Sequence, residues 1–343
     1  MMPLSQLNLM HYRALTLNGV TRLTGGGRAN PFRANRTGLG SGKAVWPLRP
    51  VANLCMNVNR WTAFMSGRFF KVVLDDVTRS PGLTGICAGY EQDEWRVKQL
   101  ATLLFRSLPD FCLRYSECVG ITADNAIERV VAAAKTMYQT EKFKSRGEFG
   151  ELILHVALKE LFDTVPAISK IFFKDSVNNT VKGFDAVHVV PTNTGLQLWL
   201  GEVKFYERIA AAIDDVCQEL DAHFEREYLR NEFLLINRKI DDAWPHAERL
   251  RVLMDENTSL DTVFEVVCVP VLLTYDSSVT GAYNKYSTEY IEAMTAELER
   301  HYARFVSKNK LTKIEVRLIL FPLREKKLLV KELHRKLEAA QCL

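Results

Sequence analysis

Residues 182–206 read KGFDAVHVVPTNTGLQLWLGEVKFY. They hold two apolar runs of strand length, separated by the turn residues Pro-Thr-Asn-Thr-Gly at 191–195. Charged residues nevertheless stand inside both runs: Asp185 in the first, and Glu202 and Lys204 in the second. A strand destined for a core carries such charges only at a cost in free energy unless each charge has a partner. The stretch therefore predicts a hairpin that bears a functional cluster.

Alternation along a β-strand puts residues two apart on the same face. Glu202 and Lys204 therefore share one face of the second strand. The short turn brings Asp185 of the first strand within reach of both. We expect two carboxylates and one ammonium group side by side at the end of a sheet.

Two neighbouring carboxylates repel each other unless a cation lies between them. Mg²⁺ suits this place, because it takes one or two carboxylates and keeps water or phosphate oxygens as its other ligands; Mn²⁺ is a possible substitute. We expect Asp185 and Glu202 to be metal ligands, with the backbone carbonyl of Val203 as a further one. Lys204 would orient the nucleophile and offset negative charge in the transition state. This is the chemistry of metal-dependent phosphodiester hydrolysis.

A helix predicted over residues 146–162 offers a further carboxylate. Glu148 and Glu151 lie three residues apart and share one face of its first turn. We assign Glu151 to the catalytic and metal-binding set, while the spacing leaves Glu148 open, and the helix dipole alone also favours carboxylates there. Gly147 and Gly150 would let this turn approach the sheet closely.

Strand and helix patterns alternate from Met65 onward. Strands are predicted over residues 68–77, 168–175, 183–190, 196–206, 265–275 and 313–323. Helices are predicted over residues 93–108, 122–139, 146–162, 210–228, 287–307 and 324–340. This alternation predicts an α/β protein with a mixed central sheet flanked by helices on both faces.

Residues 1–64 contain eight Lys and Arg and neither Asp nor Glu. Such a composition is typical of transit peptides. It also fits a disordered basic extension or upstream sequence read from a mis-set start, with Met56 or Met65 the true initiator; we favour the mis-set start, because folding patterns begin abruptly after Met65. The remainder divides into an N-terminal α/β part (65–140), a catalytic core (141–240) and a C-terminal α/β part on the same sheet (241–343).

The net charge of +4 comes from this extension alone. Without its eight basic residues, the 45 Lys and Arg fall to 37, against all 41 Asp and Glu. The body therefore has no general attraction for nucleic acid, and binding of a polyanion requires a local patch or a metal.

Other features exclude several classes of protein. No apolar run reaches the length of a membrane span. Seven cysteines without CxxC spacing indicate reduced thiols and a cytoplasmic location rather than a disulfide framework or a zinc site. The glycine-rich residues 38–44, GLGSGKA, fail the phosphate-loop pattern because Thr37 and Ala44 replace its Gly and its Ser or Thr, so we expect no nucleotide of its own.

The order of a helix carboxylate, a strand Asp and then Glu-x-Lys on the next strand resembles the restriction-endonuclease-like core of the PD-(D/E)XK nucleases. Asp185 matches the motif Asp, and residues 202–204 match the E-x-K. Phe184 stands where the motif has Pro, a position that is loosely held in this superfamily. More narrowly, GEFGE (147–151), KGFDAVH (182–188) and LWLGEVKFY (198–206) resemble the HamA family of the Hachiman anti-phage defence system. The resemblance covers the chain from about Met65 to its end.

This resemblance implies a DNA nuclease that pairs with a HamB-type helicase, is held in check in the complex and is released on DNA. Two alternatives stay open: a catalytically inactive scaffold that binds DNA or the helicase, and an unrelated α/β enzyme acting on a small phosphorylated molecule.

Several further residues have weaker patterns. We expect His188 to be packed or to support the site from behind, and His155 and His223 to be packing or surface residues rather than metal ligands. Phe205 and Tyr206 are expected at the core or its rim. Gln218 and Glu219, on the helix after the E-x-K strand, are open as substrate contacts.

Overall fold

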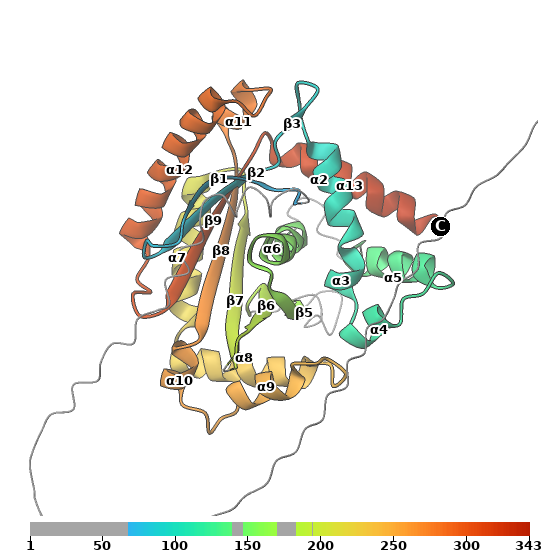
Figure 1. Ribbon diagram of the computed structural model, residues 1–343, viewed down its shortest axis with the longest axis vertical. Helices are drawn as coiled ribbons and strands as arrows, with labels where there is room; N and C mark the ends of the chain where they lie inside the picture. Colours follow the sequence, from blue (N-terminus) through green and yellow to red (C-terminus); the bar gives the residue numbers. More distant parts are fainter. Residues whose placement is uncertain (1–67, 139–146, 170–182, 194) are drawn as a thin grey trace, which may run out of the picture. The chain divides into compact units, whose positions relative to one another are not determined.

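A seven-stranded mixed sheet, in the order β1-β2-β9-β8-β7-β6-β5, forms the centre of the fold (Figure 1). The computed structural model describes residues 68–138, 147–169, 183–193 and 195–343. Strands β2, β9, β8 and β7 are parallel, whereas β1 at one side and β6 and β5 at the other are antiparallel to their neighbours. The strands are β1 (Lys71–Asp76), β2 (Gly82–Cys87), β5 (Val165–Ser169), β6 (Ala186–Pro191), β7 (Leu196–Phe205), β8 (Val267–Asp276) and β9 (Glu315–Leu323). Two short strands, β3 (Tyr90–Glu91) and β4 (Glu94–Trp95), pair separately.

Helices cover both faces of the sheet and bury a separate apolar core on each (Figure 1). The first core is built with α2 (Val97–Arg106), α3 (Leu108–Cys112), α5 (Ala126–Tyr138), α6 (Gly147–Phe162) and α13 (Lys326–Gln341). The second is built with α7 (Ile209–His223), α8 (Arg226–Lys239), α9 (Ala247–Leu253), α10 (Leu260–Phe264) and α12 (Thr288–Lys308). Two short helices, α4 (Tyr115–Val119) and α11 (Ser278–Ala282), complete the described elements.

The predicted fold class is confirmed: a mixed sheet flanked by helices on both faces. Strands from residues 65–140, 141–240 and 241–343 all pair in this one sheet. The basic extension over residues 1–64 lies outside the described residues.

Several predicted elements have other bounds in the structure. The helix predicted over 93–108 begins only at Val97, because Glu94 and Trp95 form β4, and a second helix, α3, begins at Leu108. Strand β5 begins earlier than predicted, at Val165, and residues 170–182 lie outside the described part. The helix predicted over 210–228 is two helices, because the chain leaves helical geometry at Phe224 and Glu225 before α8 begins.

Strand β2 was not predicted. It is short, wholly buried and contains two glycines, so it has neither alternation nor a high strand propensity. A Cβ atom on Gly85 would overlap a methyl group of Leu298 on α12, so a larger residue there would have to displace this buried side chain. The sheet accepts this weak strand because it lies between β1 and β9.

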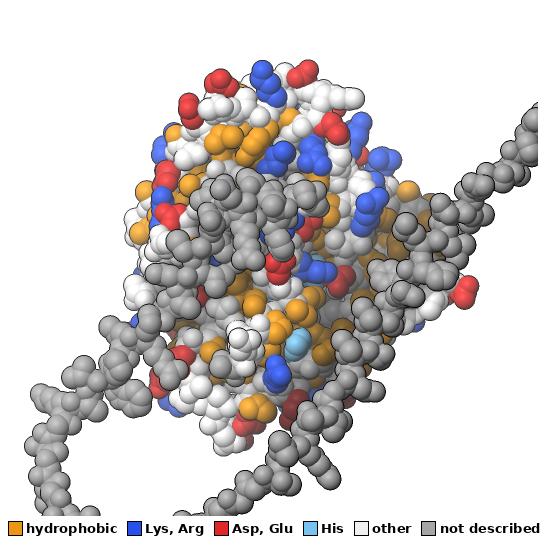
Figure 2. Space-filling model, viewed as in Figure 1, with side chains coloured by type: hydrophobic (Ala, Val, Ile, Leu, Met, Phe, Trp, Pro, Cys, Tyr) orange, Lys and Arg blue, Asp and Glu red, His pale blue; other side chains and the backbone are white. Residues whose placement is uncertain are grey.

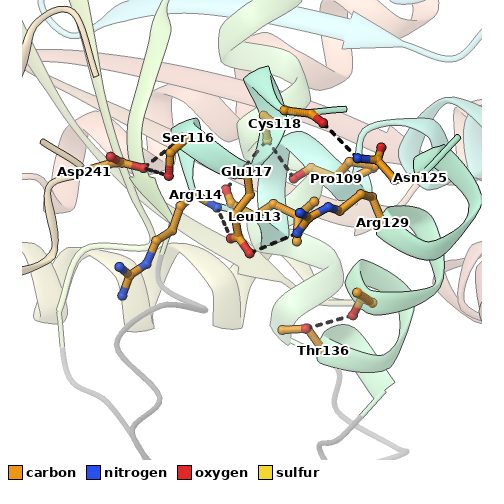
Figure 3. A network of polar contacts seen from close by, with 12 residues as sticks. Pro109, Leu113, Arg114, Ser116, Glu117, Cys118, Asn125, Arg129, Thr136 and Asp241 are labelled. Atoms are coloured by element: carbon orange, nitrogen blue, oxygen red, sulfur yellow. Dashed lines mark hydrogen bonds and ion pairs between the residues drawn. The ribbon is translucent and has the colours of Figure 1, made fainter. Parts of the chain in front are cut away.

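Polar contacts tie α4 to the distant segment that follows α8 (Figure 3). The N–H and the hydroxyl of Ser116 both donate to the Asp241 carboxylate, at 2.8 and 2.6 Å. On the other side of α4, Glu117 accepts from the backbone of Arg114 and pairs with Arg129 of α5. These contacts hold the small helices against the body.

Lys and Arg side chains gather over α2 and α13 on the face shown in Figure 2. The exposed basic residues of these helices are Lys98, Arg106, Lys327, Lys331 and Arg335. None of the described helices is both long and apolar enough to cross a bilayer.

Candidate active site

The β6–β7 hairpin forms as predicted and places Asp185 at its open end. The two strands are antiparallel, and their pairing begins at Ala186 opposite Gly201. Asp185, one residue before β6, donates its N–H to the Gly201 carbonyl at 2.9 Å. Its side-chain Oδ2 accepts from the N–H of Val203 at 2.8 Å. The carboxylate therefore lies against the edge of β7, just beyond the last paired residue.

Beyond Gly201, strand β7 continues to Phe205 without a paired β6 residue, while β8 still pairs on its other side. The N–H and C=O of one strand residue point to the same side. Since the Val203 N–H points to Asp185, its carbonyl also faces this open edge. The hydroxyl of Thr274 lies 3.5 Å from the Lys204 carbonyl on the β8 side, as this alternation requires.

A cavity of about 500 Å³ opens at this end of β7. Three of the four predicted side chains, Glu151, Asp185 and Lys204, line it together with Val203. Glu151 is 7% exposed, whereas Glu148 is not among the lining residues. The structure thus favours Glu151 of the two helix carboxylates. The other lining residues are Gly147, Phe205, Tyr206, Glu207, Arg208, Ala211, Glu219 and Lys326.

Helix α6 approaches β7 closely enough to bring Glu151 to the cavity. A Cβ atom on Gly150 would lie 2.8 Å from Cβ of Phe205 and 3.2 Å from a methyl of Val203, so only glycine permits this contact. The expectation for Gly150 is confirmed. Gly147 lines the cavity, but a Cβ there would meet nothing within 4 Å, so close approach does not require glycine at that position.

Glu202 lies on the α7 side of β7 and does not line the cavity. It is 1% exposed, and its Oε1 lies 2.6 Å from Nδ1 of His223, the last residue of α7. Burial lowers the pKa of His223, but the hydrogen bond to Glu202 and the charges of Glu202, Glu219 and Asp185 outweigh it, so the pKa of His223 is raised. His223 is therefore a buried partner of the motif Glu, which is the packing position of the two that the sequence allowed.

Lys204 forms an ion pair with Glu219 of α7. The Lys204 side chain is 11% exposed and that of Glu219 is 44% exposed, so the pair lies at the mouth of the cavity. The sequence left Glu219 open as a substrate contact. In the structure it contacts Lys204, the proposed catalytic lysine.

Lys326 reaches the cavity from the first turn of α13. Its ammonium group donates to the Phe205 carbonyl at 2.6 Å and lies 4.5 Å from the centroid of the Phe205 ring. Burial lowers the pKa of Lys326, with the charges of Glu207 and Asp276 acting in the opposite direction. Nothing in the local sequence pattern indicates this residue, because it lies 121 positions from its partner.

The remaining aromatic and histidine predictions concern packing. His155 and His188 are each 1% exposed, and their ring centroids lie 5.1 Å apart. Phe205 is buried, whereas Tyr206 is partly exposed and donates to Asp215 at 2.7 Å. These positions agree with core, packing and rim roles.

The oxygen donors at the cavity suit a hard divalent cation. Glu151 and Asp185 supply two carboxylates and Val203 a carbonyl, which matches the preference of Mg²⁺ for few carboxylates plus water. Among the described residues, no group of three or more His, Cys, Asp or Glu side chains stands close enough to bind a metal by itself. The residues present therefore fit a cation that keeps much of its water, and not a cage of protein ligands.

Comparison with known proteins gives the family of the chain. No curated protein matches the chain. The model of the HamA family matches residues 67–337, a range that includes every lining residue of the cavity. The chain therefore belongs to the HamA family, whose members are components of the Hachiman anti-phage defence system.

Proposed function

We propose that this protein is a Mg²⁺-dependent deoxyribonuclease, the effector subunit of an anti-phage defence complex, built on a PD-(D/E)XK-like core. The observation that carries the proposal is the cavity at the end of β7, which Glu151, Asp185, Val203 and Lys204 line together. Metal-dependent phosphodiester hydrolysis uses such a set of groups: two carboxylates beside a lysine at the open end of a sheet.

Each residue has a distinct role. Asp185 and Glu151 bind the metal, with the Val203 carbonyl. Glu202 does not line the cavity, so the Glu-x-Lys motif, and not the cavity, supports its place in the metal-binding set. Lys204 orients the attacking water and offsets the charge that develops on the phosphate. Mg²⁺, or Mn²⁺ in its place, supplies a polarised phosphate and a water of lowered pKa.

The exposed positive charge of α13 supports DNA as the substrate. Its residues Lys327, Lys331 and Arg335 are exposed and lie four apart, so they follow one face of the helix. Lys326, at the start of the same helix, lines the cavity. This stripe provides the local basic patch that a body of net negative charge needs in order to bind a polyanion.

The family supports a HamB-type helicase as partner and a cytoplasmic site of action. A helicase would supply the nucleotide-driven motor, in keeping with a chain that has no phosphate-binding loop of its own. The activity is then restrained in the complex and released on DNA.

The test is a cleavage assay on plasmid and linear DNA with Mg²⁺ or Mn²⁺, with and without the partner. We expect cleavage that EDTA abolishes, and that Asp185→Asn and Lys204→Ala reduce by about 100-fold or more while both variants keep the wild-type circular dichroism spectrum. Full cleavage by either folded variant contradicts the proposal. Intact DNA under every condition would instead indicate a non-catalytic scaffold that binds DNA or the helicase.

A further inference from the structure

Helix α7 contacts both charged side chains of the E-x-K strand. His223 hydrogen-bonds Glu202 at 2.6 Å, and Glu219 forms an ion pair with Lys204. None of the four proposed catalytic residues lies on α7 itself.

The spacing of the two contacts matches helix to strand. Residues four apart on a helix are separated by about 6 Å along its axis, and residues two apart on a strand by about 6.6 Å. The earlier strand residue, Glu202, meets the later helix residue, so α7 runs opposite to β7. One rigid helix can therefore hold both side chains at once.

Helix α7 is itself held in place by packing. Its buried residues Ala212, Ile213, Val216 and Leu220 belong to the core on this face of the sheet. On its outer side, Asp214 pairs with Arg304 and Lys308 of α12. A rotation of α7 would break these contacts as well as both contacts to β7.

The His223 ring has a fixed orientation. It stacks on Tyr228 with ring centroids 4.6 Å apart and planes 12° from parallel. It also meets the edge of Phe184, the residue before Asp185, at 5.4 Å. An ionised carboxylate only accepts hydrogen bonds, so when Glu202 is ionised the group that donates to it is Nδ1–H of His223. The ring thus joins the strand end that carries the motif Asp to the motif Glu.

We infer that Glu219 and His223 are positioning residues of the proposed nuclease: His223 orients the Glu202 carboxylate for the metal, and Glu219 orients the Lys204 ammonium group for the reacting phosphate. This inference rests on the proposed function. Hydrogen bonds to a metal-binding carboxylate fix its direction, and their loss weakens metal affinity or activity by about 10-fold to 100-fold.

His223 is tested by two substitutions in the full-length protein, with Mn²⁺ affinity measured by titration calorimetry. His223→Phe keeps a ring against Tyr228 and Phe184 but removes the donor, and we expect it to weaken Mn²⁺ binding by about 10-fold to 100-fold. His223→Asn keeps an N–H close to the position of Nδ1 and should stay near the wild-type affinity. Equal affinities of His223→Phe and the wild type would overturn the role of His223.

Glu219 is tested by kcat, because it acts through Lys204 and not through the metal. We expect Glu219→Ala to lower kcat by about 10-fold with the Mn²⁺ affinity unchanged, and Glu219→Gln, which keeps an acceptor, to recover part of the loss. Asp214→Ala removes a carboxylate from the outer side of the same helix and should leave both quantities at wild-type values. A loss of kcat in Asp214→Ala equal to that in Glu219→Ala would overturn the role of Glu219.

The two proposals fail in different ways. A wild-type protein that binds Mn²⁺ but never cuts DNA contradicts the nuclease, while the affinity of His223→Phe still decides the role of His223. A wild-type protein that cuts DNA, with His223 and Glu219 variants that match it, contradicts only the positioning role.

Discussion

Two buried histidines pair with carboxylates on opposite faces of the sheet, and their pKa values shift in opposite directions. On the α6 side, Nε2 of His155 lies 2.8 Å from the Asp110 carboxylate. On the α7 side, Nδ1 of His223 lies 2.6 Å from the Glu202 carboxylate. The pKa of His155 is lowered, whereas the pKa of His223 is raised.

Neighbouring charges explain the difference. Burial lowers the pKa of His155 by more than the neighbouring Asp110 raises it. Lys159, which pairs with the same carboxylate, lowers the pKa of His155 further. Burial would raise the pKa of Asp110, but the hydrogen bonds and charges of His155 and Lys159 hold it well below its usual range. Around His223, three carboxylates outweigh burial. A histidine beside a carboxylate is therefore a packing contact on one face, whereas on the other it lies among several acidic residues.

The largest expected effect is a difference in DNA cleavage between variants of the two pairs. Glu202→Gln should reduce DNA cleavage by about 100-fold or more, because it removes a charge beside the proposed metal. Asp110→Asn, the same change in the pair on the other face, should leave the cleavage rate within about twofold, since the pair only packs. Initial rates on linear DNA measure both. An equal loss in a folded Asp110→Asn would remove the functional distinction between the pairs.

The next effect is on stability. His155→Ala should lower the free energy of unfolding by about 2–3 kcal/mol, because it leaves a cavity in the core and removes one partner of Asp110. Urea denaturation followed by circular dichroism gives this difference. His155→Gln, which retains a polar group near Nε2, is the control and should lose less. A midpoint unchanged by His155→Ala would show that the pair adds nothing to the fold.

A smaller effect concerns pH. Because the folded state lowers the pKa of His155 from its usual 6.5, the unfolded chain binds more protons as the pH falls below that value. The free energy of unfolding should therefore decrease from pH 6.5 downward, by at most about 1.4 kcal/mol per pH unit for one proton. The measurement is the free energy of unfolding of the wild type minus that of His155→Gln, determined at steps of half a pH unit. A difference that grows as the pH falls would have the wrong sign.

The smallest effect is expected at an exposed ion pair. Asp214 pairs with Arg304 and Lys308 at the surface of α7 and α12. Asp214→Ala should cause no measurable change in the thermal midpoint, because solvent screens exposed pairs. A clear decrease of the thermal midpoint would mean that exposed ion pairs stabilise this fold as well. A loss of stability at His155 could then not be assigned to its burial.

Much of the fold was predictable because it depends on local pattern. The apolar runs at β8 and β9 and the long periodic helices α12 and α13 are found within a few residues of their predicted ends. Strand β2 was not predictable from the sequence, because its burial and its glycines depend on packing against α12 and the neighbouring strands rather than on alternation. The break between α7 and α8 likewise lacks a glycine or proline at its position.

The order of residues along the chain is enough to put Glu202 and Lys204 on one strand face and Asp185 near β7, because strand alternation and a short turn act over a few residues. The packing of distant elements is what puts Glu151 and not Glu148 at the cavity, brings Lys326 into it, and sets α7 against the E-x-K side chains. Those outcomes depend on how helices pack against the sheet, which brings together residues far apart in the chain, such as Phe205 and Lys326 at a separation of 121 positions. Packing of that kind leaves no period in the sequence.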